Sequence, residues 1–247
     1  MPHFIQFLNF KGGTGKTTSV LNVGAGLAGA GYRVCMVDMD AQHNLTQSCG
    51  VNEPQMTVYS SMVEKKPLAL AEVAPNLYLA ANGLEMVKFE IEAAAMVRRE
   101  YLLQQSLRPH TKDFDFFLFD CPPSLGLSTI NALFASDHVA VFVPVEAEFL
   151  ALKGFAVLNE ALQNVEMEIS RAFVTKYDKR KILARSVLDA MQTQFGDRLF
   201  KTLIRENVAL AEAPAVGLDI FRHEPTSAGA YDYAELTKEI LNYFTNE

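Results

Sequence analysis

Short apolar runs alternate with helix-like patterns along almost the whole chain. Most runs are followed by a stretch in which apolar positions recur every three or four residues. This alternation is typical of repeated βα units, which build a parallel sheet covered by helices on both faces. We therefore expect an α/β fold with a doubly wound, mostly parallel sheet flanked by helices. The predicted strands are residues 4–8, 33–37, 77–81, 114–119, 139–143, 169–174 and 199–204.

The predicted helices fall between these strands. Residues 17–30 show helical spacing up to the stop signal of Gly31. Residues 55–110 are less regular, and their longest helix candidate, 84–107, is stopped by Pro109. Further helices are expected over residues 149–162, 182–195 and 230–244. Since no repeat, linker or low-complexity tract interrupts the pattern, all 247 residues are predicted to form a single domain.

The charge of the chain is acidic overall but unevenly distributed. The formal net charge is −7, which argues against a generally basic nucleic-acid binder. Between residues 171 and 185, however, there are six basic residues and one acid, a net charge of +5, so the remainder carries −12. A polyanion such as DNA would therefore have one place to bind.

Composition also limits where the protein can work. No run of 18 apolar residues and no secretory signal is present, so we expect a cytoplasmic protein with no membrane partner. Cys35, Cys49 and Cys121 lack the paired spacing of zinc or iron–sulfur ligands, and we expect buried free thiols. No histidine stands in a recognisable relation to Cys121, which we interpret as a packing residue and not a nucleophile.

A glycine-rich turn directly follows the first predicted strand. Its sequence is Lys11-Gly12-Gly13-Thr14-Gly15-Lys16-Thr17-Thr18. Glycines let main-chain N–H groups surround a phosphate, and the N-terminus of the following helix adds a partial positive charge. In such a loop Lys16 would reach the β and γ phosphates, and the Thr17 hydroxyl would bind Mg²⁺. An ordinary glycine-rich turn is the alternative, but the strand–turn–helix setting favours nucleotide binding.

Acidic residues follow two of the predicted strands. Asp38 and Asp40 come at the end of the second strand, where alternation in an extended chain would place both on one side. Asp120 follows an apolar strand, and a buried carboxylate there requires a metal ion or a hydrogen-bond network. Because ligands of open parallel sheets bind beyond the carboxyl ends of the strands, these aspartates are candidates for a hydrated Mg²⁺ and an attacking water. The alternative is that Asp38 and Asp40 merely cap turns.

Several segments together resemble one protein family. The loop from Lys11 has the extra lysine of a deviant Walker A motif, and Phe10 stands where the general pattern has glycine. The string Asp38-Met39-Asp40-Ala41-Gln42 resembles D-x-D-P-Q with alanine for proline, and Asp120 begins D-C-P-P-S-L-G. Further matches begin at Pro144, Tyr177 and Asn207. The chain is similar to ParA/Soj partition ATPases of the MinD/ParA P-loop superfamily over nearly its whole length, most weakly at residues 55–110.

This resemblance implies a weak Mg-dependent ATPase with ATP and Mg²⁺ as cofactors, which forms a homodimer in the ATP state. By the family pattern Lys11 crosses the dimer interface to the partner's phosphates, and Asp40 orients the attacking water. Lys11, Lys16 and Asp40 would be catalytic. The nucleotide-binding residues would be Lys11, Gly12, Gly13, Thr14, Gly15, Lys16, Thr17, Thr18 and Asn207, and the metal-binding residues Thr17, Asp38 and Asp120. The alternative for Lys11 is a solvated surface lysine.

The resemblance also implies non-specific binding of double-stranded DNA, association with the nucleoid, and stimulation by a ParB-like activator. The predicted DNA contacts are Lys179, Arg180, Lys181 and Arg185. Ala209 stands where the family has a second DNA-binding arginine, and a solvated helix face is the alternative for the whole cluster. Since only ten residues precede Lys11, no N-terminal helix-turn-helix domain is expected.

Other functions remain open at this point. A ParA-like ATPase could instead position a protein cargo or a conjugation machinery, with DNA absent or serving only as a track, and Ala209 and the net charge favour this alternative. The basic membrane helix of MinD is not matched, because residues 236–247 are acidic on balance. The paired cysteines of the nitrogenase iron protein are missing. A kinase or ligase with the same loop would need an acceptor site, and none is evident.

Overall fold

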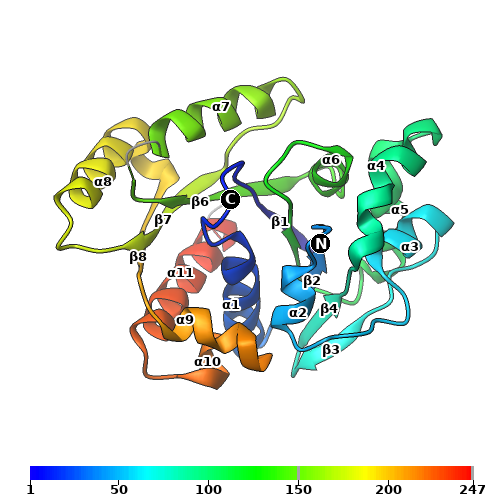
Figure 1. The fold of residues 1–247 in the computed structure, drawn as a ribbon, viewed down its shortest axis with the longest axis horizontal. Coiled ribbons are helices and arrows are strands. Elements are labelled where there is room, and N and C mark those ends of the chain that lie inside the picture. Colours follow the sequence, from blue (N-terminus) through cyan, green and yellow to red (C-terminus); the bar gives the residue numbers. More distant parts are fainter. Residues whose placement is uncertain (149–150, 246–247) are drawn as a thin grey trace.

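An eight-stranded sheet runs through the centre of the molecule (Figure 1). The computed structural model describes residues 1–148 and 151–245, and the strand order within them is β3-β4-β2-β5-β1-β6-β7-β8. All neighbours are parallel except β3, which pairs antiparallel with β4 at one edge. The mostly parallel sheet predicted from the sequence is confirmed. The strands are β1 (His3–Phe7), β2 (Val34–Asp38), β3 (Ala71–Ala74), β4 (Leu77–Ala80), β5 (Phe116–Asp120), β6 (Val139–Glu146), β7 (Arg171–Tyr177) and β8 (Leu199–Arg205).

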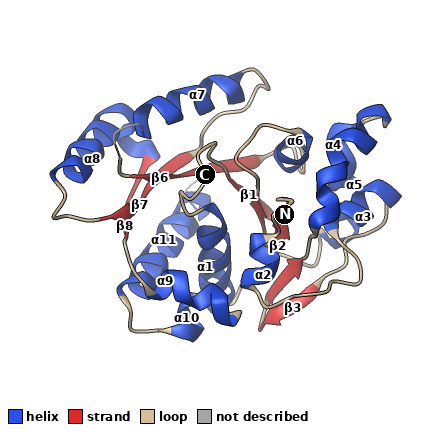
Figure 2. Cartoon of the chain, in the orientation of Figure 1, coloured by secondary structure: helices blue, strands red, loops and turns tan. Residues whose placement is uncertain are grey.

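Helices cover both faces of the sheet, as Figures 1 and 2 show. One layer consists of α1 (Lys16–Gly29), α2 (Asn44–Ser48), α9 (Ala209–Glu212), α10 (Ile220–His223) and α11 (Ala228–Thr245). The other consists of α3 (Val58–Glu64), α4 (Phe89–Glu92), α5 (Leu102–Leu107), α6 (Leu127–Leu133), α7 (Ala151–Gln163) and α8 (Ile182–Phe195). This is the doubly wound arrangement expected from the alternating pattern.

Alternate residues of the central strands face opposite layers. In β1, Ile5 and Phe7 belong to the core under α1 and α11, whereas Phe4 belongs to the core on the other face. There Phe4 stacks on Phe117 of β5, with ring centroids 5.1 Å apart. Because both faces are buried, the sequence of such a strand is almost continuously apolar. Each large side chain buried in this way contributes about 1.5–3 kcal/mol to folding.

The parallel strands bring their carboxyl ends to one edge of the sheet. β2 and β5 are neighbours in register, so Asp38 lies directly beside Asp120. β1 pairs with β5 on its other side and is followed at the same edge by the glycine-rich turn. Residues that are far apart in the sequence therefore meet beyond the strand ends, as expected for an open parallel sheet.

The prediction of a single long helix over residues 84–107 is wrong. The structure divides this segment into 3₁₀ turns, the one-turn helix α4 and the short helix α5. Met96 is extended (φ −77°, ψ 137°), and Arg98 is in the left-handed region (φ 57°). These breaks let Phe89 and Leu102 enter the core from separate turns. Hydrophobic spacing at a helical period cannot show such an interruption, because the apolar positions remain correctly spaced on both sides of it.

Further elements differ from the sequence prediction in smaller ways. The edge strand β3 and the helices α2 and α3 were not predicted. The predicted helix 182–195 agrees with α8. The helix predicted over residues 149–162 corresponds to α7, and its predicted start at Phe149 lies outside the described residues, as do the last two residues of the acidic C-terminal segment.

Carboxylates of α11 cover the outer edge of β8. Glu239 accepts hydrogen bonds from the N–H groups of Lys201 (2.8 Å) and Thr202 (2.7 Å). Asp232 accepts from the N–H of Arg205 (2.9 Å) and also pairs with its guanidinium (2.6 Å). The unpaired N–H groups of an edge strand can bind a strand of another molecule. The contacts with Glu239 and Asp232 occupy some of these groups in β8.

The three cysteines are free thiols, as expected from their spacing, but they are not equally buried. Cys35 and Cys121 are buried, Cys49 is half-buried, and all three are free. Burial raises the pKa of the Cys121 thiol well above its usual range, which fits a packing role. Across the described ranges, no helix combines the length and the apolar character that crossing a bilayer requires.

Candidate nucleotide site

The loop from Lys11 to Thr18 joins β1 to α1 at the carboxyl edge of the sheet. Gly13 (φ 76°) and Gly15 (φ 91°) are left-handed, a conformation that glycine adopts without steric cost. Gly15 is the N-cap of the 14-residue helix α1; it has no side-chain acceptor, and no acidic residue lies in the first turn. The first N–H groups of α1 therefore have no competing side chain and are available to an anion.

Lys16 lies over this loop with its side chain buried. Its ammonium group donates to the carbonyl oxygens of Asn9 (3.0 Å) and Lys11 (3.2 Å). Desolvation lowers its pKa, although the charges of Asp120 and Asp40 oppose this. Two neutral carbonyl groups thus hold the lysine at the loop, and a phosphate oxygen could replace them with a stronger, charge-assisted hydrogen bond.

Asp120 is buried at the end of β5 beside the first turn of α1. The Thr17 hydroxyl donates to Asp120 Oδ2 (2.7 Å), and Asp120 Oδ1 is buried without a hydrogen-bond partner in the described part of the chain. Desolvation raises the pKa of Asp120 well above its usual range, and the charge of Asp38 raises it further. A cation bound at this point would stabilise the ionised carboxylate and lower the pKa of Asp120 again.

Thr46 of α2 supports Asp38, a contact that the sequence analysis missed. The Thr46 N–H (2.9 Å) and hydroxyl (2.7 Å) both donate to Asp38 Oδ2, and the Asp40 N–H donates to Asp38 Oδ1 (3.1 Å). Desolvation nevertheless raises the pKa of Asp38 to about 6. Only a prediction of α2, which packs beside β2, could have indicated Thr46.

Asp40 lies just outside the strand, half-buried in the loop after β2. Since β2 ends at Asp38, the strand alternation expected to place both aspartates on one side does not extend to Asp40. Asp40 Oδ1 accepts from the Gln42 N–H (2.9 Å), which shapes this turn. Its charge still acts on the pKa of both Lys16 and Asp120, so it belongs to the same cluster.

The side chains at this edge suit Mg²⁺ better than a softer metal ion. Thr17, Asp38 and Asp120 offer only oxygen atoms, the ligands that hard cations prefer. Within residues 1–148 and 151–245, no group of three or more His, Cys, Asp or Glu side chains could by itself hold a metal ion. Mg²⁺ commonly keeps several waters and adds one or two carboxylates and substrate phosphates, so this partial set of oxygens fits it.

Lys11 is half-exposed, and its side chain contacts two glutamates. Its ammonium group pairs with Glu146 of β6 (2.8 Å) and with Glu148. Partial desolvation alone would lower the pKa of Lys11, but the hydrogen bonds with Glu146 and Glu148 outweigh it and raise the pKa. Lys11 is therefore not simply solvated. Glu146 was missed by the sequence analysis, and Glu148 appeared there only within a matched segment.

Asn207 lies beyond the end of β8, separated from β1 by β6 and β7. It follows β8 at the carboxyl edge of the sheet, the same edge as the loop. Its Oδ1 atom is buried and has no hydrogen-bond partner among the described residues. Within the part of the chain that the structure describes, Asn207 thus offers an unpaired acceptor at this edge of the sheet.

The predicted DNA contacts gather at the end of β7 and the start of α8. Lys179, Arg180, Lys181 and Arg185 are all exposed. Arg180 forms a two-pronged ion pair with Asp178 (2.8 Å at the shortest) and holds the pKa of that carboxyl well below its usual range. Lys181 pairs with Glu206 (3.3 Å). The structure brings the four cations together, but two of them already have carboxylate partners.

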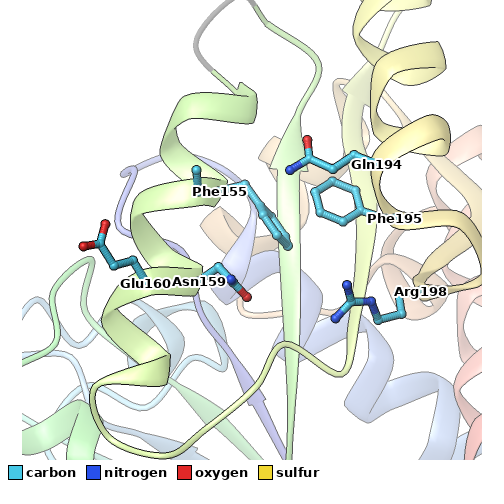
Figure 3. A pocket seen from close by; sticks show the side chains of 7 residues that line it. Phe155, Asn159, Glu160, Gln194, Phe195 and Arg198 are labelled. Atoms are coloured by element: carbon cyan, nitrogen blue, oxygen red, sulfur yellow. The ribbon is translucent and has the colours of Figure 1, made fainter.

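A separate hollow of about 190 Å³ lies between α7 and α8 (Figure 3). The rings of Phe155 and Phe195 lie next to each other there at a tilted angle of 51°, with centroids 4.1 Å apart, and Glu160 and Arg198 also line it. No residue predicted to bind nucleotide or metal contributes to this hollow. The phosphate loop and this pocket are therefore different features of the surface.

Comparisons with known proteins agree with this geometry. A family model described as an AAA domain matches residues 2–175. The chromosome-partitioning ATPase Soj of Treponema pallidum is 37% identical over 246 residues, which cover 96% of each chain. The chain belongs to the ParA/Soj family of ATPases. A second relative in this family, the sporulation initiation inhibitor protein Soj of Bacillus subtilis, is 36% identical over 251 residues, or 97% of this chain and 98% of the relative.

A solved structure supports the fold of this ParA/Soj chain. Cobyrinic acid a,c-diamide synthase from Mycobacterium smegmatis, with bound ADP and magnesium, superposes with a TM-score of 0.86 at 27% identity. The match covers 99% of this chain and 96% of that one. The family and the P-loop fold predicted from the sequence are thus confirmed. The predicted cofactors, ATP and Mg²⁺, agree with the ADP and magnesium bound in that structure.

Proposed function

We propose that this chain is a Mg-dependent ATPase that dimerises around ATP and acts in DNA partition. The main support is the meeting of an uncapped helix N-terminus, the buried Lys16 and the adjacent Asp38 and Asp120 at one edge of the sheet. This edge of the sheet therefore combines groups that can bind phosphate with carboxylates that can bind a metal cation. The name of the Treponema relative supports the role in partition.

In this proposal the main-chain N–H groups of the loop surround the triphosphate. Lys16 leaves the carbonyl oxygens of Asn9 and Lys11 for the β and γ phosphates. The Thr17 hydroxyl would hold the metal, with Asp38 and Asp120 in its outer shell. The bound Mg²⁺ would neutralise charge on the β and γ phosphates. Further nucleotide contacts come from Gly12, Gly13, Thr14, Gly15, Thr18 and Asn207.

Asp40 orients the attacking water in this proposal. It is half-buried beside Asp38, at the border between the acidic pair and solvent. Phosphoryl transfer depends mainly on positioning and on stabilisation of charge. We infer that a single subunit hydrolyses ATP slowly, because the lysine proposed to complete its phosphate site comes from a second copy.

Lys11 is that cross-subunit residue. Within one chain it pairs with Glu146 and Glu148, and its side chain is 43% exposed. Ion pairs this exposed are worth about 1 kcal/mol or less each. The charge of a triphosphate in a second subunit can therefore displace them, which couples ATP binding to dimerisation.

Replacing Lys11 with alanine tests this role. Lys11→Ala should keep nucleotide affinity in the monomer within about 3-fold, because removing an exposed pair has a small effect. It should abolish the mass increase that ATP induces in static light scattering. The matched control is Lys112→Ala, which removes an exposed lysine at the far end of β5. A Lys11→Ala protein that still dimerises with ATP would contradict the proposal.

Double-stranded DNA is the proposed track of the ATP dimer, bound without sequence preference through Lys179, Arg180, Lys181 and Arg185. Two copies would double the number of cations on one surface, which strengthens attraction to phosphates. Such binding would place the protein on the nucleoid in the cytoplasm. A ParB-like activator with a short basic segment is proposed to accelerate hydrolysis.

A second candidate function is a ParA-like ATPase that positions a protein cargo or a conjugation machinery. It is favoured by the ion pairs that already engage Arg180 and Lys181, and by Ala209, which is buried where a DNA-binding arginine was expected. If DNA plays no part in it, even as a track, such an ATPase would dimerise with ATP but would leave arbitrary duplex DNA unbound at any salt concentration.

A further inference from the structure

The end of β7 packs directly on the phosphate loop. The Thr175 hydroxyl donates to the carbonyl oxygen of Thr14 (2.8 Å), and Thr175 is buried. The next residue, Lys176, extends its ammonium group toward Gly13: a β carbon built on that glycine would lie 3.8 Å from Lys176 Nζ. A third lysine, after Lys11 and Lys16, thus stands at the loop.

The backbone of Lys176 is unusual for a residue of a strand. Its φ is 51°, in the left-handed region that residues with a β carbon seldom adopt. The pairing of β7 with β8 shifts register between Val174 and Tyr177, so Lys176 lies within an irregularity of the ladder. Such bulges often occur beside active sites, where they redirect a side chain. Here the redirected group is a cation beside a phosphate loop.

Glu146 connects this lysine to Lys11. Its Oε1 atom lies 3.7 Å from Lys176 Nζ, while its Oε2 atom accepts from Lys11 Nζ (2.8 Å). Lys176 is 47% exposed and its contact with Glu146 is long, so this pair is weak. A di- or triphosphate carries more negative charge than one carboxylate and would compete well for the same ammonium group.

We propose that Lys176 is a further nucleotide-positioning residue. Its ammonium group moves away from Glu146 and contacts the phosphates bound in its own subunit. This rests on the proposed function, in which the loop from Lys11 to Thr18 binds ATP. The contact is made within one subunit because Thr175 fixes the backbone of Lys176 to the loop itself. Glu146 then has two tasks: it holds Lys176 before the nucleotide arrives and holds Lys11 until a second copy arrives.

Nucleotide affinities of charge variants test this proposal. Lys176→Met keeps an unbranched side chain that is one atom shorter and removes its charge, and it should weaken binding of a non-hydrolysable ATP analogue about 10-fold in titration calorimetry. The loss for ADP should be smaller, since ADP carries less charge. Lys176→Arg should bind nearly as the unchanged protein does, and Lys112→Met is the control for loss of an exposed lysine.

A second variant, Glu146→Gln, tests whether Lys176 contacts phosphate or only supports the local structure. The comparison is made in the Lys11→Ala background, where Glu146 no longer holds Lys11. If Glu146 competes with phosphate for Lys176, Glu146→Gln strengthens binding of the ATP analogue in that background and has no effect once Lys176→Met is added. The loss caused by Lys176→Met should also persist in the Lys11→Ala background, where the proposed dimer cannot form. A loss that disappears in that background would place the contact in the partner subunit and overturn the proposal.

Two other results would also overturn it. One is an affinity of Lys176→Met equal to that of Lys112→Met, and the other is an equal loss in Lys176→Met and Lys176→Arg accompanied by a lower melting temperature, which indicates a purely structural role. A failure of the proposed function looks different, because the unchanged protein would then bind no ATP analogue at all.

Discussion

Asp38 is a buried carboxylate that lies beside Asp120 and accepts hydrogen bonds from Thr46. Its pKa is about 6 in the folded protein, mainly through desolvation, against about 3.9 in an unfolded chain. Folding therefore disfavours its ionised form. The resulting cost is absent below about pH 4, grows as the pH rises, and is complete above about pH 6.

Asp38→Asn should remove this pH dependence. Without nucleotide and metal, the free energy of unfolding of the variant relative to the unchanged protein should rise by about 1–2 kcal/mol between pH 5 and pH 8, because asparagine carries no charge to desolvate. Urea unfolding at several pH values measures this difference. Asp113→Asn, at an exposed aspartate, is the control and should show none of it. A difference for Asp38→Asn that is independent of pH would contradict the argument.

At the residue scale, the parts of the site that could be predicted are those with a local signature. The loop from Lys11 to Thr18 and the aspartates at strand ends are visible in the sequence because the chemistry and the turn occur in one segment. Glu146 and Lys176 carry no such signature. They reach the loop through the order of β6 and β7 in the sheet and through a bulge, and spacing along one chain does not report either.

At the element scale, α1 depends on close packing against α11. A β carbon built on Gly26 would lie 3.2 Å from Thr237 Cβ and even closer to its hydroxyl oxygen. Thr237 is buried, and its hydroxyl donates to the carbonyl oxygen of Tyr233 (2.7 Å), so it cannot easily move away. The glycine thus allows the helix that starts at the phosphate loop to lie against the C-terminal helix.

Gly26→Ala should therefore destabilise the protein by about 1–3 kcal/mol, because overpacking outweighs the better helix propensity of alanine. Gly29→Ala, one turn further along α1, is the matched control: nothing lies within 4 Å of the added carbon. It should stabilise the protein slightly, by about 0.5–1 kcal/mol. Thermal unfolding of both variants measures the contrast, and equal effects would refute the packing argument.

Whole elements were predictable where burial on both faces left a clear pattern. The central strands are nearly continuously apolar, and α8 and α11 carry a regular apolar stripe. The segment between β4 and β5 was mispredicted because Met96 and Arg98 break the backbone without changing the apolar spacing. Neither residue is a glycine or a proline, so the usual stop signals were absent there.

At the scale of the whole molecule, the uneven charge makes DNA binding testable. Lys179 and Arg185 are exposed and form no ion pair with any described residue, so they are the cations of the cluster most available to phosphates. With ATP, the protein should shift arbitrary duplex DNA at low salt, and its affinity should fall steeply as salt rises.

Replacing both Lys179 and Arg185 with alanine should reduce the slope of log affinity against log salt by about 0.9 for each lost phosphate contact. Gel shifts over a salt series measure this slope. The control variant removes two exposed cations elsewhere, Arg108 and Lys112, and should leave the slope unchanged. If the unchanged protein shifts no duplex at any salt concentration, the chain is better explained as an ATPase that positions a protein cargo.

The carboxylates that cover β8 also restrict how copies of this chain can associate. Glu239 and Asp232 already accept the main-chain hydrogens of Lys201, Thr202 and Arg205. A neighbouring molecule cannot extend the sheet past that border without first displacing them. Growth of the sheet into fibrils by edge-to-edge pairing of copies is therefore disfavoured on this side.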